Sequence, residues 1–465
     1  MHIRLSLAAL LLAAGFAAAG ETAAIQDLTR RNRQLEERVH RLERTALEED
    51  VEAYLKQGAD YRGAEGGTAL LPGGMGIRFS GQIRVREDIS DKAYGPADPA
   101  GARSFEFTHM RTRLRADIDV YKDVTATIEF QDVRVFGAEG KTTGMINSVD
   151  LKRGILEFKE ILEGPVSVEL GRLFLTYGDD RIIGHLEWFD QGRSYDGFRV
   201  KIRPDGWWLD LMGVRVRDTA PTVDDDRWFF AAYGGRKWIE VYVLFLGDHM
   251  ATPGETGTGT SDFATIGFRI HRKTNDNHWD YTTEVVFQTG DVNGDDLTAF
   301  GFVFNGGYTF VDHAWKPRVG IEVAYASGDD DPTDGDQGGL QTLFPTNHPH
   351  YGIADVVGWN NLLDLHARVT VHPRDKVTVT LGYHTFEVIE ERGQWVNAGG
   401  GVIRSGAPGV DNHLGDEVDL TIVWSPRKGI RFLVQYAIFV PGGFVRDTGN
   451  DPTSNVAYIQ TSVKF

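Results

Sequence analysis

Residues 111–131, RTRLRADIDVYKDVTATIEFQ, carry the pattern that decides the fold. Apolar or small residues at positions 114, 116, 118 and 120 alternate with charged residues, and the alternation resumes at Val124 after the turn Tyr121-Lys122-Asp123. Successive side chains of a strand point to opposite faces, so each half is expected to form a strand with one apolar and one polar face. The stretch therefore predicts a β-hairpin that separates two different environments.

The same alternation runs from Ile77 to the C-terminal residue, Phe465, and yields eighteen strand-like segments. An open sheet of that size would expose two long edges, whereas closure into a barrel removes them. A β-propeller would show a blade repeat of about 40 residues, and the sequence has none. The pattern therefore favours one closed barrel.

The connections between these segments alternate in length. Short turns lie at 121–123, 204–206, 372–375 and 425–428, and long polar connections lie at 89–104, 247–260, 327–359 and 389–415. Outer-membrane barrels have short periplasmic turns and longer outer loops. We therefore predict an all-β fold, an eighteen-stranded antiparallel transmembrane β-barrel in the bacterial outer membrane, with both barrel ends on the periplasmic side.

Composition narrows the function classes. The absence of cysteine excludes disulfide scaffolds, Cys-ligated metals and thiol catalysis. A formal net charge of −18 argues against nucleic acid as a partner. Tryptophans near strand ends, such as Trp207, Trp279 and Trp424, match an interfacial aromatic girdle. Outer-membrane lipid and lipopolysaccharide are therefore the expected surroundings.

The N-terminal region differs from the barrel. Residues 1–20 resemble a cleavable signal peptide, although a membrane anchor is the alternative. Within 21–57, a heptad seam predicts a short periplasmic coiled-coil helix and homo-oligomer formation through residues 25–46, with a lone amphipathic helix as the alternative. The seam comprises Ile25, Leu28, Asn32, Leu35, Val39, Leu42 and Ala46. A Gly-rich linker at 58–76 precedes the barrel at 77–465.

Two long blocks carry a resemblance. Residues 170–203 read LGRLFLTYGDDRIIGHLEWFDQGRSYDGFRVKIR, and residues 343–373 read LFPTNHPHYGIADVVGWNNLLDLHARVTVHP. Both blocks resemble the alginate export family of outer-membrane porins. The resemblance implies an eighteen-stranded monomeric channel and the passage of an acidic polysaccharide through a cationic lumen.

Two ladders of cationic residues are candidates for the solute path. Alternate residues of a strand lie about 6.6–6.8 Å apart on one face. The first ladder contains Arg84, Arg86, Arg111, Arg113 and Arg115, and the second contains Arg199, Lys201 and Arg203. Arg172 and Arg181, from the first family block, are further candidates, and Arg193 is a weaker one. The alternative is that these cations pair with acids and only fill and stiffen the barrel.

Other candidate sites are weaker. Asp329, Asp331 and Asp334 form an acidic loop that could hold calcium, with a solvated loop or a lipopolysaccharide contact as the alternative. No resident cofactor is expected otherwise. His348 and His350 near Asp355, and the pair His366 and His384, lack an accompanying nucleophile motif, so an enzyme is not predicted.

The sequence thus predicts an outer-membrane channel for passive passage or export of anionic or saccharide-like solutes, with an acidic polysaccharide such as alginate as one candidate. The alternative is a structural barrel that tethers the envelope through its N-terminal coiled coil.

Overall fold

The computed structural model describes residues 68–70, 76–91, 105–138, 149–218, 223, 225–274 and 278–465. The predicted signal peptide, the coiled-coil helix with its seam at 25–46, and most of the predicted linker lie outside the described residues. Three linker residues form the short strand β1 (Thr68–Leu70), which pairs antiparallel with the start of β2.

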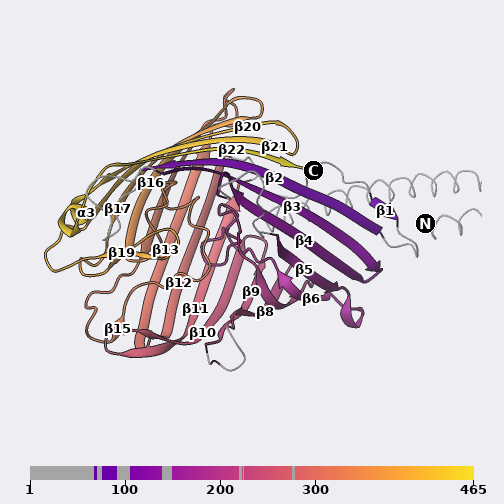
Figure 1. Ribbon diagram of the computed structural model, residues 1–465, viewed down its shortest axis with the longest axis horizontal. Helices are drawn as coiled ribbons and strands as arrows, with labels where there is room; N and C mark the ends of the chain where they lie inside the picture. The colour runs from indigo at the N-terminus through magenta and orange to yellow at the C-terminus, as the bar shows by residue number, and fades with distance from the viewer. Residues whose placement is uncertain are drawn as a thin grey trace, which may run out of the picture. The chain divides into compact units, whose positions relative to one another are not determined.

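Eighteen long strands form the barrel wall (Figure 1). The first nine are β2 (Gly76–Ser90), β3 (Phe105–Tyr121), β4 (Val124–Val135), β5 (Asp150–Phe158), β6 (Val166–Leu173), β7 (Tyr195–Ile202), β8 (Trp208–Arg217), β9 (Arg227–Arg236) and β10 (Ile239–Pro253). The others are β11 (Thr258–Lys273), β12 (Trp279–Val292), β13 (Asp295–Thr309), β14 (Arg318–Ala326), β16 (Leu362–Arg374), β17 (Val377–Glu387), β20 (His413–Arg427), β21 (Ile430–Pro441) and β22 (Ser454–Lys464).

Each long strand pairs antiparallel with the next, and β22 pairs with β2, for example Val463 opposite Ile83. The sheet is therefore closed, and the predicted eighteen-stranded antiparallel barrel is confirmed. The closing seam reaches the last residue: the Gly81 N–H donates to the Phe465 carbonyl (2.7 Å). A Cβ at position 81 would lie 2.6 Å from the Phe465 ring, so glycine leaves the space that this ring occupies.

The two faces of the wall follow the sequence alternation. Outward residues such as Leu114, Val241 and Ile459 are about half exposed, at 52%, 52% and 53%. Inward residues such as Arg111 and Arg113 are 1% exposed. Because exposed apolar side chains need an apolar solvent, the outer face is suited to lipid and the inner face to a polar interior.

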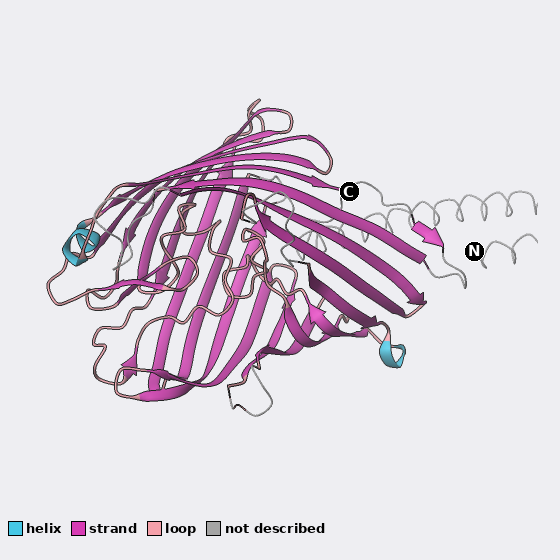
Figure 2. Cartoon of the chain, viewed as in Figure 1, coloured by secondary structure: helices cyan, strands magenta, loops and turns pink. Residues whose placement is uncertain are grey.

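Short turns join the strands at one end of the barrel, and long connections join them at the other. The shorter elements lie in or beside the connections, and they are η2 (Ile161–Glu163), β15 (Asp336–Gln337), β18 (Gln394–Val396), β19 (Val402–Ser405) and α3 (Gly443–Thr448). Within the described ranges, no helix has the length and apolar character needed for a membrane span. Several connections run across the barrel interior as pink traces in Figure 2, and two of them build the site described next.

Candidate functional site

Two connections fold into the barrel and meet there. Inner segment A, residues 174–194, joins β6 to β7, and inner segment B, residues 327–361, contains β15 and joins β14 to β16. They run side by side through a parallel bridge between Ile183 and Phe344. The Gly184 N–H donates to the Phe344 carbonyl (2.7 Å), and the Phe344 N–H donates to the Ile182 carbonyl (3.0 Å). The two segments therefore form one joined constriction.

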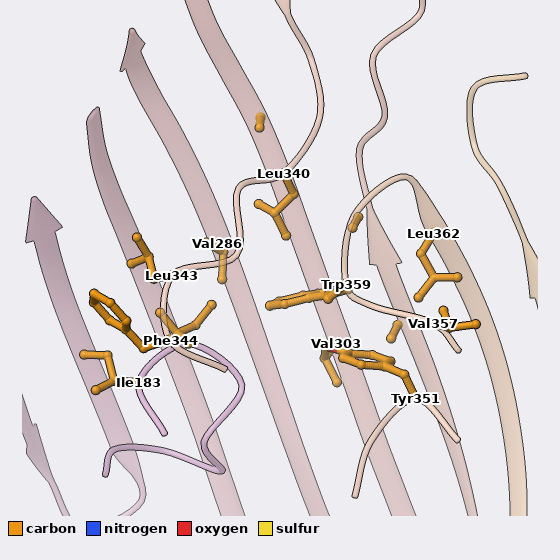
Figure 3. Close-up of a cluster of buried hydrophobic side chains, with 14 of the residues drawn as sticks. Ile183, Val286, Val303, Leu340, Leu343, Phe344, Tyr351, Val357, Trp359 and Leu362 are labelled. Atoms are coloured by element: carbon orange, nitrogen blue, oxygen red, sulfur yellow. The ribbon is translucent and has the colours of Figure 1, made fainter. Parts of the chain in front are cut away.

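An apolar cluster fastens this constriction to the wall (Figure 3). The Phe344 ring packs edge-on against Phe229 of β9, with ring centroids 5.0 Å apart, and Trp359 covers Gly301 on β13, where a Cβ would lie 3.0 Å from its ring. The Trp359 indole N–H donates to the Tyr325 carbonyl (3.0 Å). Because burial of each large apolar side chain contributes about 1.5–3 kcal/mol, the segments are held as part of the wall.

The β3 part of the first ladder binds a single acid of inner segment A. Arg111 Nη2 donates to Glu187 Oε2 (2.7 Å), and Arg113 Nη1 donates to Glu187 Oε1 (2.6 Å). Burial alone would raise the pKa of the Glu187 carboxyl, but these two guanidinium groups hold it well below its usual value. Glu187 is therefore an ionised bridge between the ladder and the constriction.

The β2 part of the ladder binds the next residues of inner segment A. Arg84 pairs with Asp190 and also donates to the Glu187 carbonyl (2.8 Å), and Arg86 donates to the Trp188 carbonyl (2.7 Å). Burial opposes ionisation of Asp190, but the hydrogen bond from His109 and the charge of Arg84 lower its pKa to about 2. These four arginines thus contact inner segment A and hold the constriction.

Arg115 lies one step further along β3, toward the short turn at 121–123. Its guanidinium donates to Asp117 of the same strand (2.7 Å). Asp117 also accepts from the Thr127 hydroxyl (2.7 Å). Arg115 therefore belongs to the inner wall below the constriction.

The second ladder pairs with acids on the nearby wall strands β5, β6 and β8. Arg199 donates to Glu169 (2.5 Å), and Lys201 pairs with Glu169 (2.8 Å) and with Glu157. Arg203 pairs with Asp210 (2.5 Å), whose side chain is fully buried. Charge pairs thus line this wall, and no inner-segment acid contributes to them among the described residues.

Arg172 and Arg181 have different positions. Arg172 pairs with Asp196 (2.7 Å) on the face that carries the exposed Leu170 and Phe198, so it lies on the outer face and the predicted pore-lining position is wrong. The physical reason is the strand period, because Arg172 follows Leu170 by two residues. Arg181 is 2% exposed in the constriction and donates to Glu322 on β14 (2.5 Å).

Inner segment B is joined to inner segment A by aromatic and polar contacts. The rings of Trp188 and His348 stack 3.6 Å apart, and the Arg86 guanidinium lies 4.1 Å from the Trp188 ring centre. Arg181 also donates to the Tyr351 hydroxyl (2.9 Å), and Arg193 donates to the Pro345 carbonyl (2.5 Å). These contacts hold the two segments as a unit.

The histidines considered for an enzyme have structural partners. His350 Nε2 donates to the Asp179 carbonyl (2.8 Å), and His348 Nδ1 lies 3.0 Å from the Asp355 carboxylate. Burial and the charge of Arg181 lower the pKa of His350 below its usual value. His366 and His384 stack with centroids 3.7 Å apart on β16 and β17.

The acidic loop also binds the protein itself. Asp329 accepts from the Gly338 N–H (3.4 Å), Asp331 pairs with Arg392 (3.1 Å), and Asp334 accepts from the Asp336 N–H (2.9 Å). Among the described residues, no group of three or more acidic or histidine side chains could hold a metal ion. Calcium binding therefore stays a prediction.

Sequence reasoning missed the central acids of the constriction. Glu187, Trp188 and Asp190 lie inside the quoted block 170–203, but only the arginines of that block were singled out. The available signal was the run Leu186-Glu187-Trp188-Phe189, which is too apolar for a connection exposed to water. Such a run indicates a connection that packs inside the protein.

The fold agrees with the comparisons to known proteins. The sequence model of the alginate export family matches residues 76–458, which include all of the barrel except its last residues. The chain belongs to the alginate export family. The family and the fold are those of outer-membrane channels for solutes, which are not enzymes. The predicted family is thus confirmed, and no curated protein matches the chain.

Solved structures similar to this alginate export family barrel share its fold at low sequence identity. Pseudomonas aeruginosa OccK11 (OpdR) has a TM-score of 0.53 and 9% identity, with 84% of this chain and 96% of that chain covered. P. aeruginosa OccD3 (OpdP) has a TM-score of 0.53 and 12% identity, with 87% and 94% covered. P. aeruginosa OccK2 (OpdF), solved in complex with glucuronate, has a TM-score of 0.51 and 10% identity, with 84% and 98% covered.

Proposed function

We propose that this channel passes anionic and saccharide-like solutes along its lumen, past the inner wall that lies between the constriction and the short turns. This stretch is called the wall below the constriction. The observation that carries the proposal is the make-up of that wall. It combines charge pairs, such as Lys201 with Glu169 and Arg318 with Asp280, with hydroxyl side chains such as Thr370, Thr380 and Thr421. Such groups exchange hydrogen bonds with hydroxyls and carboxylates, while their opposed charges limit the net field.

The similar structures support this solute class. P. aeruginosa OpdK was crystallised with vanillate, and P. aeruginosa OccK2 was crystallised in complex with glucuronate. Both ligands are carboxylates with a single ring, and glucuronate also carries sugar hydroxyls. An acidic polysaccharide such as alginate presents the same carboxylate and hydroxyl groups along a chain, so it belongs to the proposed solute class as its polymeric member.

The first ladder has an indirect role in this proposal. Arg84, Arg86, Arg111 and Arg113 are engaged by inner segment A and are at most 5% exposed, so they act on solutes by positioning the constriction. Contact with a passing anion is assigned instead to cationic groups on the wall below. The Arg-lined path of the proposal is therefore the second ladder and its neighbours.

Planar bilayers and loaded liposomes test this function. Purified protein should conduct in a salt gradient, with a reversal potential showing preference for the anion, and should let glucose and glucuronate enter liposomes. Uronate oligomers of increasing length would show whether a polymer enters the liposomes at a rate similar to that of its monomer. Absence of conductance, or a cation preference, would contradict the proposal.

The proposed surroundings follow from the outer face. Exposed apolar side chains such as Leu114 and Val241 fit outer-membrane lipid, and we propose lipopolysaccharide contact at the long connections. Homo-oligomer formation through residues 25–46, a periplasmic place for that helix and a tethering role remain predictions on residues outside the described ranges. Deleting residues 21–57 tests them: loss of envelope integrity with transport intact would favour the tether.

A further inference from the structure

Arg368 lies on the inner wall directly below the constriction. In this sheet, residues that lie opposite one another on successive strands form a row, and both neighbours of Arg368 in its row are glycines. In the sheet register it is opposite Gly320 on β14 and Gly382 on β17. Its neighbour two residues toward the constriction, His366, stacks on His384. Because glycine has no side chain, neither neighbour in the row covers the guanidinium.

The acids around Arg368 already have other partners. Glu322 accepts from Arg181 (2.5 Å), and Asp280 accepts from Arg318 Nε and Nη2 (2.8 and 2.5 Å). One row away, His384 donates to Asp364 (2.9 Å). Each nearby carboxylate is thus engaged by a different cation or by His384.

Asp419, which shares the row of Arg368 two strands away, accepts from the Ile353 N–H (3.3 Å) of inner segment B. No hydrogen bond or ion pair joins Arg368 to any residue in the described part of the chain. The Arg368 side chain is intermediate in exposure, and none of its nitrogen atoms is among the fully enclosed polar atoms that lack a partner. Arg368 is therefore a half-buried cation whose charge is available to a solute.

Hydroxyl groups lie in the next row, on the side away from the constriction. Thr370 follows Arg368 by two residues on β16, and its hydroxyl is 3.0 Å from that of Thr380 on β17. Thr421 continues the row on β20 and accepts from Gln435 (3.2 Å). A cation and a line of hydroxyls thus share one side of the lumen.

We propose that Arg368, with Thr370 and Thr380, forms a subsite for a hydroxylated carboxylate of the sugar-acid class as it leaves the constriction. The guanidinium takes the carboxylate through two parallel N–H···O bonds, and the threonine hydroxyls bond to the ring hydroxyls. The carboxylate also neutralises a cation that is partly removed from water. The inference rests on the proposed channel function and names the residues that select the solute.

Block of chloride current by sodium glucuronate tests the subsite in the full-length protein. In Arg368→Gln, the half-blocking concentration should rise about tenfold or more, the effect of losing one charged hydrogen-bonded pair. The matched control is Arg272→Gln, which removes the same charge from β11 on the face opposite to the inward Arg269 and should block like the wild type. Heat-dependent gel mobility shows that each variant is folded.

Two further comparisons make the test specific. Thr380→Val should weaken block by glucuronate about threefold, the lower range for one lost hydrogen bond, and should leave block by acetate unchanged because acetate has no hydroxyls. Equal block of wild type and Arg368→Gln, or equal block by glucose and glucuronate, would overturn the subsite and leave the channel function standing. A wild-type protein without conductance would overturn the channel function itself.

Discussion

The two cationic ladders look alike in sequence but have different partners. Arg84, Arg111 and Arg113 of the first ladder pair with Glu187 and Asp190, which belong to a connection 74 or more residues away along the chain. The second ladder pairs with Glu157, Glu169 and Asp210 on the nearby wall strands β5, β6 and β8. A ladder paired across strands stiffens the wall, whereas a ladder paired with a connection decides how far the lumen is closed.

The largest effect is expected from Glu187→Gln. It removes the shared partner of Arg111 and Arg113, and loss of one partner of a buried ion pair costs about 3–5 kcal/mol. We expect inner segment A to detach and single-channel conductance to rise severalfold. The control is Glu157→Gln in the second ladder, which should change conductance little. Similar conductance of the two variants would remove the distinction between the ladders.

Lowering the pH is expected to have a smaller effect on conductance, because it protonates the Asp190 carboxylate. Its pKa is lowered to about 2 by His109 and Arg84 against the effect of burial, while an unfolded aspartate has a pKa of about 3.9. A lowered carboxyl pKa stabilises the folded state above the unfolded pKa, and the contribution of about 2 kcal/mol is lost as pH falls from about 4 to about 2.

Conductance recorded as a function of pH measures this contribution. The constriction should be unchanged at pH 5 and should loosen only as the pH approaches 2. In Asp190→Asn, part of that acid response should be absent and conductance at pH 7 should already be higher. A channel that opens between pH 5 and 7 would contradict the assignment.

Trp188→Leu should have a moderate effect on how inner segments A and B stay joined. It removes the stack on His348 and the contact with Arg86, together worth about 1–2 kcal/mol. Current noise should increase while the mean conductance stays close to that of the wild type. Trp188→Phe keeps an aromatic ring, so its current noise should be close to that of the wild type.

The smallest effect is expected from Arg115→Gln. By sequence, Arg115 belongs to the first ladder, but it pairs with Asp117 on its own strand. In this respect it resembles the second ladder, whose cations also pair with acidic residues of the wall strands. A pair that is partly exposed contributes about 0–1 kcal/mol. Conductance and thermal unfolding should therefore remain near wild type. A change as large as that of Glu187→Gln would show that Arg115 also supports the constriction.

Much of the fold was predictable because it depends on local period. The spacing of two residues between Leu114, Ala116 and Ile118 identifies the apolar face of β3. The eighteen strands were located from the same spacing. The site was less predictable. The sequence placed Arg111 and Arg113 on the inner face, but their partner Glu187 lies 76 and 74 residues away in a connection with no strand period.

The sequence by itself determined the closed wall and its two faces, since a period of two residues assigns each side chain to lipid or lumen whatever the rest of the chain does. The tertiary structure alone decided which connections turn inward and which acids meet which arginines. Those contacts depend on apolar packing of Ile183, Phe344 and Trp359 against the wall. Such packing exists only after the strands have closed around it.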